Sequence, residues 1–136
     1  MEEESFWEAT EIPALTDKLT GETYGCFTDP DSGFRVYMNA GSPAGLRWTV
    51  SARQTATFFK RLFKGDDIFL DIGANHGRYT LLALSKGVRF VYAIEAEERN
   101  FDLLRKHVQL SGKGEFVELK NVFASDTGET VSLNWQ

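Results

Sequence analysis

The stretch that decides the fold reads DIGANHG, from Asp71 to Gly77. It follows the apolar run 68–72, which we interpret as a buried parallel strand. It leads into residues 77–86, whose apolar side chains recur at helical spacing. Gly73 and Gly77 let the backbone turn tightly and approach a ligand without a Cβ in the way. The loop therefore stands at the carboxyl end of a strand, where open α/β sheets bind their ligands.

The alternation of strand and helix continues downstream of this loop. We predict a second strand over 88–94, an amphipathic helix over 97–110 that Gly112 closes, and a third strand over 116–124. Alternating Val131, Leu133 and Trp135 suggest a last strand. Such an order is typical of βαβ units with right-handed crossovers. The fold class is α/β, a Rossmann-like doubly wound parallel sheet that appears incomplete, with its first three βα units only.

Upstream, we divide the chain into an N-terminal extension, residues 1–50, and an α/β domain, residues 51–136. In the extension, two aromatic runs, 23–27 and 34–38, flank the turn signal Asp29-Pro30-Asp31-Ser32-Gly33, which predicts a β-hairpin. Residues 52–64 predict a helix. We expect core packing from its apolar face, formed by Phe58, Phe59, Leu62 and Phe63.

Composition narrows the function classes. The 136 residues carry a net charge of −5, which argues against a nucleic-acid partner because a basic surface would be expected there. No segment is long and apolar enough to span a bilayer, so we expect no membrane partner. The acidic N-terminus and the single cysteine, Cys26, favour a cytoplasmic protein. We expect an inert thiol and no metal site.

The sequence of the loop also indicates which nucleotide cofactor it binds. In the dinucleotide fingerprint G-x-G-x-x-G the third glycine falls one residue later than Gly77, and Asn75 would crowd a pyrophosphate. Asp71 is unhelpful beside phosphates but suits a ligand with an ammonium and a sulfonium. Glu95, at the end of the second strand, can accept hydrogen bonds from both ribose hydroxyls. These features point to S-adenosyl-L-methionine as cofactor, with an NAD-type Rossmann fragment as a less favoured alternative.

At this point the sequence resembles FkbM-type methyltransferases. The opening motif of that family is similar to Asp71-Ile72-Gly73-Ala74-Asn75-x-Gly77-x-Tyr79-Thr80-Leu81-Leu82-Ala83. Residues 93–96 resemble its second strand, with Ala96 where the family usually has proline, and Asn100 and Leu104 fit the helix that follows. Residues 124–128 resemble its segment after the third strand. The resemblance, over about residues 50–133, implies an S-adenosylmethionine-dependent O-methyltransferase acting on a small-molecule hydroxyl of a sugar or secondary metabolite.

We therefore assign nine residues to cofactor binding, with Asp126 near the adenine by the same resemblance: Asp71, Gly73, Ala74, Asn75, Gly77, Thr80, Glu95, Ala96 and Asp126. Plainer interpretations stay open. Asp71 and Asp126 could be turn formers, and Glu95 a solvated charge at a helix start. We expect the side chains of His76 and His107 to face solvent.

The catalytic residues stay unknown, because nothing in the sequence matches the motif that ends a later strand of the family. Without further strands, residues 68–72 would leave an unpaired sheet edge, which proteins usually cover. Either the hairpin, residues 23–38, covers this edge, or a homodimer or a partner supplies the missing strands. The alternative function is a non-catalytic half-domain that binds the cofactor or a partner.

Overall fold

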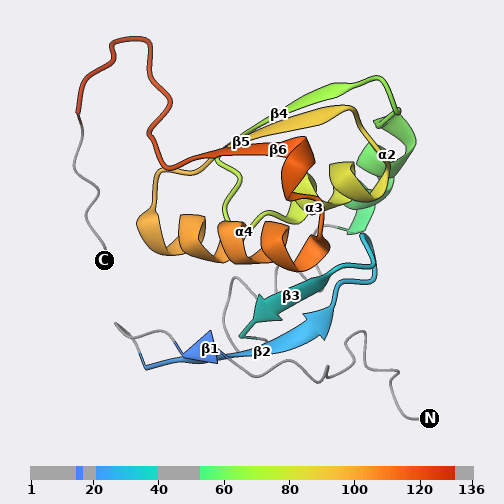
Figure 1. Ribbon diagram of the computed structural model, residues 1–136, viewed down its shortest axis with the longest axis horizontal. Helices are drawn as coiled ribbons and strands as arrows, with labels where there is room; N and C mark the ends of the chain where they lie inside the picture. Colours follow the sequence, from blue (N-terminus) through green and yellow to red (C-terminus); the bar gives the residue numbers. More distant parts are fainter. Residues whose placement is uncertain (1–14, 17–20, 40–52, 131–136) are drawn as a thin grey trace.

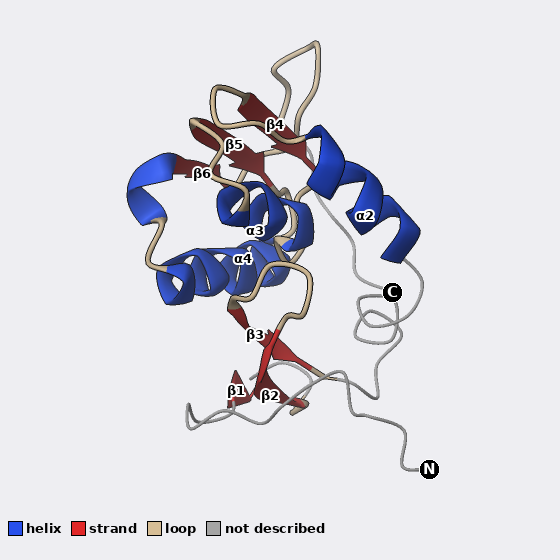
Figure 2. Ribbon diagram, turned by 90° about the vertical axis from the view of Figure 1, so that its right-hand side faces the viewer, coloured by secondary structure: helices blue, strands red, loops and turns tan. Residues whose placement is uncertain are grey.

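The computed structural model describes residues 15–16, 21–39 and 53–130. These residues form three layers: a parallel sheet, a layer of helices on one of its faces, and a small antiparallel sheet beyond the helices (Figures 1 and 2). The N-terminal hairpin and the α/β part therefore pack as one body. The helix layer lies between the two sheets.

The parallel sheet carries the predicted α/β core. It consists of β4 (Ile68–Ile72), β5 (Phe90–Ile94) and β6 (Val117–Lys120), in the order β4-β5-β6. Both pairs are parallel, and Asp71 lies opposite Ala93 in the register. β4 forms within the residues expected of it, and β5 starts two residues later than expected. Because both pairs are parallel, the carboxyl ends of all three strands lie at the same edge of the sheet.

The helices follow from apolar periodicity and from their caps. They are α2 (Arg53–Leu62), α3 (Arg78–Ser85), α4 (Glu98–Ser111) and the short 3₁₀ helix η2 (Gly114–Phe116). α4 begins where the Glu97 side chain accepts a hydrogen bond from the Asn100 amide, at 2.7 Å. It ends at Gly112 in the left-handed conformation, the predicted stop. Caps of this kind fix where α4 begins beside the glycine loop.

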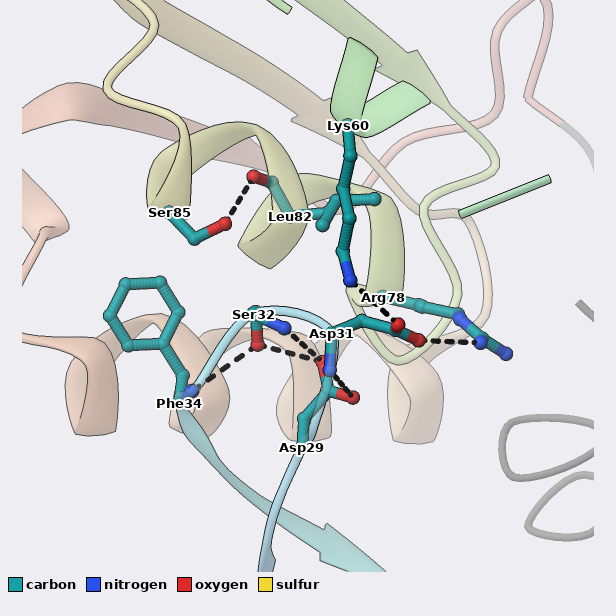
Figure 3. A network of polar contacts seen from close by, with 8 residues as sticks. All are labelled: Asp29, Asp31, Ser32, Phe34, Lys60, Arg78, Leu82 and Ser85. Carbon is teal, nitrogen blue, oxygen red and sulfur yellow. Dashed lines mark hydrogen bonds and ion pairs between the residues drawn. The ribbon is translucent and has the colours of Figure 1, made fainter. Parts of the chain in front are cut away.

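The N-terminal sheet confirms the predicted hairpin. β1 (Leu15–Thr16), β2 (Thr23–Thr28) and β3 (Arg35–Met38) pair antiparallel. The connecting turn is held by Asp29, whose carboxylate accepts from the amides of Asp31 and Ser32 and from the Ser32 hydroxyl (Figure 3). β3 packs on α4, and Val36 and Met38 join one apolar core with Leu81, Val91 and Leu104. The hairpin thus shares its core with the α/β part.

Several expectations fail on packing. Phe59 and Phe63 pack with Phe69, as expected of the α2 face, whereas Phe58 and Leu62 are 62% and 51% exposed. Phe59 lies toward β4 and α3, where it contacts Phe69 and Tyr79, whereas Phe58 and Leu62 lie on the part of the helix that turns away from them. The third strand ends at Lys120 rather than residue 124 because Asn121 turns to donate to the backbone carbonyls of Glu95 and Ala96. The last predicted strand, over 131–135, lies outside the described residues.

The second face of the parallel sheet is open across the described ranges (Figures 1 and 2). Ile68, Leu70 and Ile72 on β4 are 55–59% exposed there, and Tyr92 on β5 is 40% exposed. Among these same ranges β4 pairs only with β5, so its outer edge stays free, as expected. The hairpin does not cover that edge, because it packs against α4 instead. No helix of the described part is long and apolar enough to cross a membrane.

Candidate functional site

The glycine loop, residues 73–77, forms the centre of the candidate site. It connects β4 to α3, and its backbone takes positive φ at Gly73 (73°), Asn75 (55°) and Gly77 (96°). The amides of Gly73 and Ala74 both donate to the Ile94 carbonyl at 2.9 Å, so the loop folds back over the end of β5. A Cβ on Gly73 would meet open space, whereas one on Gly77 would lie 2.7 Å from Leu104 Cδ1. Gly73 therefore faces outward, and Gly77 lets α3 approach α4.

Glu95 ties the loop to the end of β5. Its carboxylate accepts from the Asn75 amide at 2.6 Å through Oε2 and from the Glu97 amide at 3.0 Å through Oε1. The residue is 8% exposed, which rules out a freely solvated helix-start charge. Because an ionised carboxylate has about four lone-pair positions, roughly two remain for further donors. Glu95 thus shapes the loop and keeps hydrogen-bonding capacity at its surface.

Asp71 lies behind the loop rather than on it. It sits on the helix-facing side of β4 at 8% exposure, and its Oδ2 accepts from the Thr80 hydroxyl at 2.6 Å. Burial raises the pKa of Asp71, and the nearby Glu95 charge adds to this effect, while the hydrogen bonds from Thr80 oppose it. Two predicted site residues therefore meet here. The direct contact between Asp71 and a ligand ammonium stays a prediction.

The other candidates divide between core, loop and surface. Ala74 is buried at 6% exposure and belongs to the apolar core, and Asn75 is exposed at the outer turn. Ala96 is partly buried, and its carbonyl accepts from the Asn121 side chain at 3.1 Å. Asp126 stands in the exposed segment 121–130, which runs out from β6 (Figure 1). Its role near an adenine stays a prediction.

Both histidines differ from the expectation that they face solvent. The His76 ring lies 3.0 Å from Asn100 Oδ1, and burial lowers its pKa. His107 is fully buried: its Nδ1 lies 2.6 Å from the His76 carbonyl, and its Nε2 accepts from the Tyr37 amide at 2.8 Å. A signal for this burial was present in the sequence, because His107 and Val108 stand three and four residues after Leu104, on one helical face.

A hollow adjoins the loop between β1–β2 and the N-terminal half of α4. Its lining includes His76 of the glycine loop, Asn100 and Asn121. Tyr24 lines the side toward β2, and Arg99, Arg105 and Lys106 supply cations along α4. Asp102 pairs with both Arg105 and Lys106, at 2.5 and 3.6 Å. The lining therefore carries both signs of charge, because the carboxylates of Glu98 and Asp102 stand among the three cations.

The chain is similar to known proteins in its structure, whereas its sequence matches none. No protein-family model matches the chain, and no curated protein matches it. It is similar to the structure of M. jannaschii TYW2 in complex with AdoMet, with a TM-score of 0.60, 20% identity, and coverage of 81% of this chain and 46% of that one. The structure of the M. jannaschii tRNA m1G37 methyltransferase is similar with a TM-score of 0.56 and 18% identity, over 77% of this chain and 33% of that one. A complex of aTrm5 and tRNALeu is similar with a TM-score of 0.56 and 20% identity, over 83% of this chain and 32% of that one.

These structures contradict the expectation of a small-molecule acceptor and no nucleic-acid partner. One of the similar proteins is a tRNA methyltransferase, and another was solved with tRNALeu. The inference from charge was wrong because net charge averages over a whole surface, whereas a phosphate backbone responds to local clusters of Lys and Arg. It was also drawn from a chain that spans less than half the length of the proteins it resembles.

At 18–20% identity, the likeness establishes architecture. The described part of the chain therefore has the Rossmann-like α/β fold of these structures, over part of their length.

Proposed function

We propose that this chain binds S-adenosylmethionine and belongs to a methyltransferase. The observation that carries the proposal is the loop 73–77, locked to the buried carboxylate of Glu95 at the carboxyl ends of β4 and β5. Open α/β sheets bind ligands at this edge. The similarity in fold to a protein solved with AdoMet supports this choice of ligand.

The roles of the site residues follow from their geometry. The free lone pairs of Glu95 accept from the ribose hydroxyls, which are charge-assisted hydrogen bonds. Gly73, with open space on its Cβ side, lets the ligand contact the backbone. Asp71 and Thr80 hold the strand end against α3 and place negative charge behind the loop, favourable for a sulfonium or an ammonium in front of it. A phosphate at the same place would be repelled.

The bound cofactor would supply a methyl group on a positively charged sulfur. This methyl group would be transferred to a nucleophile of the acceptor. The described residues form the cofactor side of this arrangement. We place the residues that would activate the acceptor nucleophile outside the described ranges, so we name no catalytic residue.

For the acceptor, we propose RNA. Two observations favour it: the similar structures include a tRNA methyltransferase and a complex with tRNALeu, and the hollow beside the loop carries three cations, Arg99, Arg105 and Lys106, against two carboxylates, Glu98 and Asp102. Tyr24, in the same lining, offers a ring on which a base can stack. The FkbM-type assignment concerns the sequence of the loop and stays a hypothesis about family. The cytoplasmic location, favoured by the single cysteine, is part of the same proposal.

The test is a methyl-transfer assay with radiolabelled S-adenosylmethionine. The 136-residue chain and the product of any longer reading frame that contains it are incubated with total tRNA, transcribed tRNA and a panel of sugars. We expect label in RNA from the full-length product and none in the sugars. Label in sugars alone would overturn the RNA acceptor. Cofactor binding without transfer by any product would favour the alternative, a cofactor-binding half-domain.

A further inference from the structure

His107 connects three elements that are distant in sequence. It lies on α4, it contacts the carbonyl of His76 in the glycine loop, and it accepts the amide proton of Tyr37 on β3, 70 residues away. The residue is 0% exposed, and the Tyr37 ring stacks on it with ring centroids 6.2 Å apart. Water therefore has little access to either bond. Each partner demands a definite state of the imidazole.

The two partners determine the tautomer. A carbonyl oxygen can only accept, so Nδ1 must carry the proton that bonds to His76. A backbone amide can only donate, so Nε2 must present a lone pair to Tyr37. The ring is therefore neutral, with its proton on Nδ1. Burial lowers the pKa of His107 to about 4, which agrees with a neutral ring at physiological pH.

The loop needs such an anchor. His76 stands between Asn75 and Gly77, both at positive φ, and a non-glycine residue in that region carries a conformational cost. The sheet side of the loop is held by Ile94 and Glu95. On the helix side, the bond from His107 Nδ1 to the His76 carbonyl holds the backbone, and Asn100 contacts the His76 ring.

We propose that His107 is a positioning residue of the glycine loop, and that β3 acts on the cofactor site through it. The Tyr37 amide selects the tautomer whose Nδ1 proton fixes the His76 carbonyl. The N-terminal sheet thus sets loop geometry without touching a ligand. This inference rests on the proposed function insofar as the loop binds S-adenosylmethionine.

Two substitutions separate the two bonds. In His107→Asn the side-chain amide nitrogen takes the place of Nδ1 and can still donate to His76. In His107→Gln the side-chain oxygen takes the place of Nε2 and can still accept from Tyr37, but the bond to the loop is lost. Val108→Ala, at the next buried position of α4, serves as a stability control because its side chain belongs to the core.

The experiment uses the 136-residue chain and three measurements: titration with S-adenosylhomocysteine, amide hydrogen exchange, and ¹⁵N NMR of the histidines. We expect His107→Gln to weaken binding about 10-fold, the loss of roughly one hydrogen bond, and to speed exchange in residues 74–77 but not in β5. His107→Asn should lose less affinity than His107→Gln, although both lose stability. Val108→Ala should lose stability with the loop exchange rates of the wild type.

Results that contradict the positioning role can be told apart from those that contradict the proposed function. An Nε2 proton on His107 in the wild-type NMR spectrum would overturn the proposal without any variant. Equal loss of affinity in both His107 variants, or loop exchange that follows stability in Val108→Ala, would reduce His107 to a core residue. If the wild type binds no methionine-derived ligand, the proposed function fails. The exchange and NMR data then still decide the positioning role.

Discussion

At the scale of the residue, Glu95 serves the loop and the ligand together. Glu95→Ala removes an acceptor from the Asn75 amide as well as the charged bonds expected to ribose. Since a charged hydrogen bond contributes roughly 1.5–3 kcal/mol, affinity for S-adenosylmethionine should fall about 10- to 100-fold. Titration calorimetry measures this affinity. The control is Glu118→Ala, at an exposed position of β6. An unchanged dissociation constant in Glu95→Ala would make Glu95 a bystander.

The two glycines of the loop separate backbone strain from crowding. Both have positive φ, but only at Gly77 would a Cβ meet a neighbour, Leu104 Cδ1 at 2.7 Å. Gly73→Ala should cost roughly 1–2 kcal/mol of unfolding free energy from strain, and Gly77→Ala about 1–3 kcal/mol more. Urea denaturation of both variants checks this. Equal losses of unfolding free energy would contradict this. They would show that Leu104 moves aside freely and that the close approach of α3 and α4 does not require glycine at position 77.

Buried His107 gives stability a dependence on pH. Burial lowers its folded-state pKa from 6.5 to about 4, so between these values the unfolded chain binds the proton and the folded chain does not. The free energy of unfolding should therefore fall as the pH drops from about 6.5 to 4, by roughly 3 kcal/mol. The lowered pKa of His76 acts in the same direction, and the raised pKa of Asp71 opposes it at the acid end.

Urea denaturation at a series of pH values measures this slope. His107→Gln should flatten the curve between pH 6.5 and 4, because the group that the unfolded chain protonates has been removed. An equally steep curve in that variant would assign the slope to other groups.

At the scale of the element, ion pairs of Asp31 connect the β2–β3 turn to the helices. Its carboxylate pairs with Lys60 on α2 at 2.9 Å and with Arg78 on α3 at 3.1 Å (Figure 3). Burial alone would raise the pKa of Asp31, but the two cations reverse this and lower it. Because all three side chains are at most 30% exposed, the pairs are less screened than surface pairs.

Asp31→Ala should therefore lower the free energy of unfolding by roughly 1–2 kcal/mol. Asp66→Ala, an exposed carboxylate between α2 and β4, should change it little. Thermal and urea denaturation of both variants at low and high salt would compare them. Equal, small effects would mean that the turn is held by Asp29 and the core alone.

The elements also show what sequence can predict. Strands β4 and β5 and helices α3 and α4 were predicted to within two residues, because their apolar periods and caps are local signals. The end of β6 was missed because it depends on Asn121 reaching the carbonyls of Glu95 and Ala96, a tertiary contact. The burial of His107 was missed because its charged neighbour Lys106 masked the apolar face that it shares with Leu104.

At the scale of the whole molecule, the loop and Glu95 were identified from sequence because strand order dictates that their elements end at one edge. Their interlocking through the Asn75 amide was not predictable, since it depends on the exact rotamer of Glu95. The exclusion of a nucleic-acid partner, which was drawn from net charge, was wrong, and so was the small-molecule acceptor that the resemblance implied. The face formed by Ile68, Leu70 and Ile72 is exposed, as expected if further elements would cover it.

The central claim, that this loop and Glu95 hold S-adenosylmethionine, has one direct test. Titration calorimetry on the purified chain compares S-adenosylmethionine and S-adenosylhomocysteine with NAD, under the same buffer and salt. We expect saturable binding of both methionine-derived ligands at a stoichiometry of one and no measurable heat with NAD. Binding of NAD, with no response to either methionine-derived ligand, would contradict it.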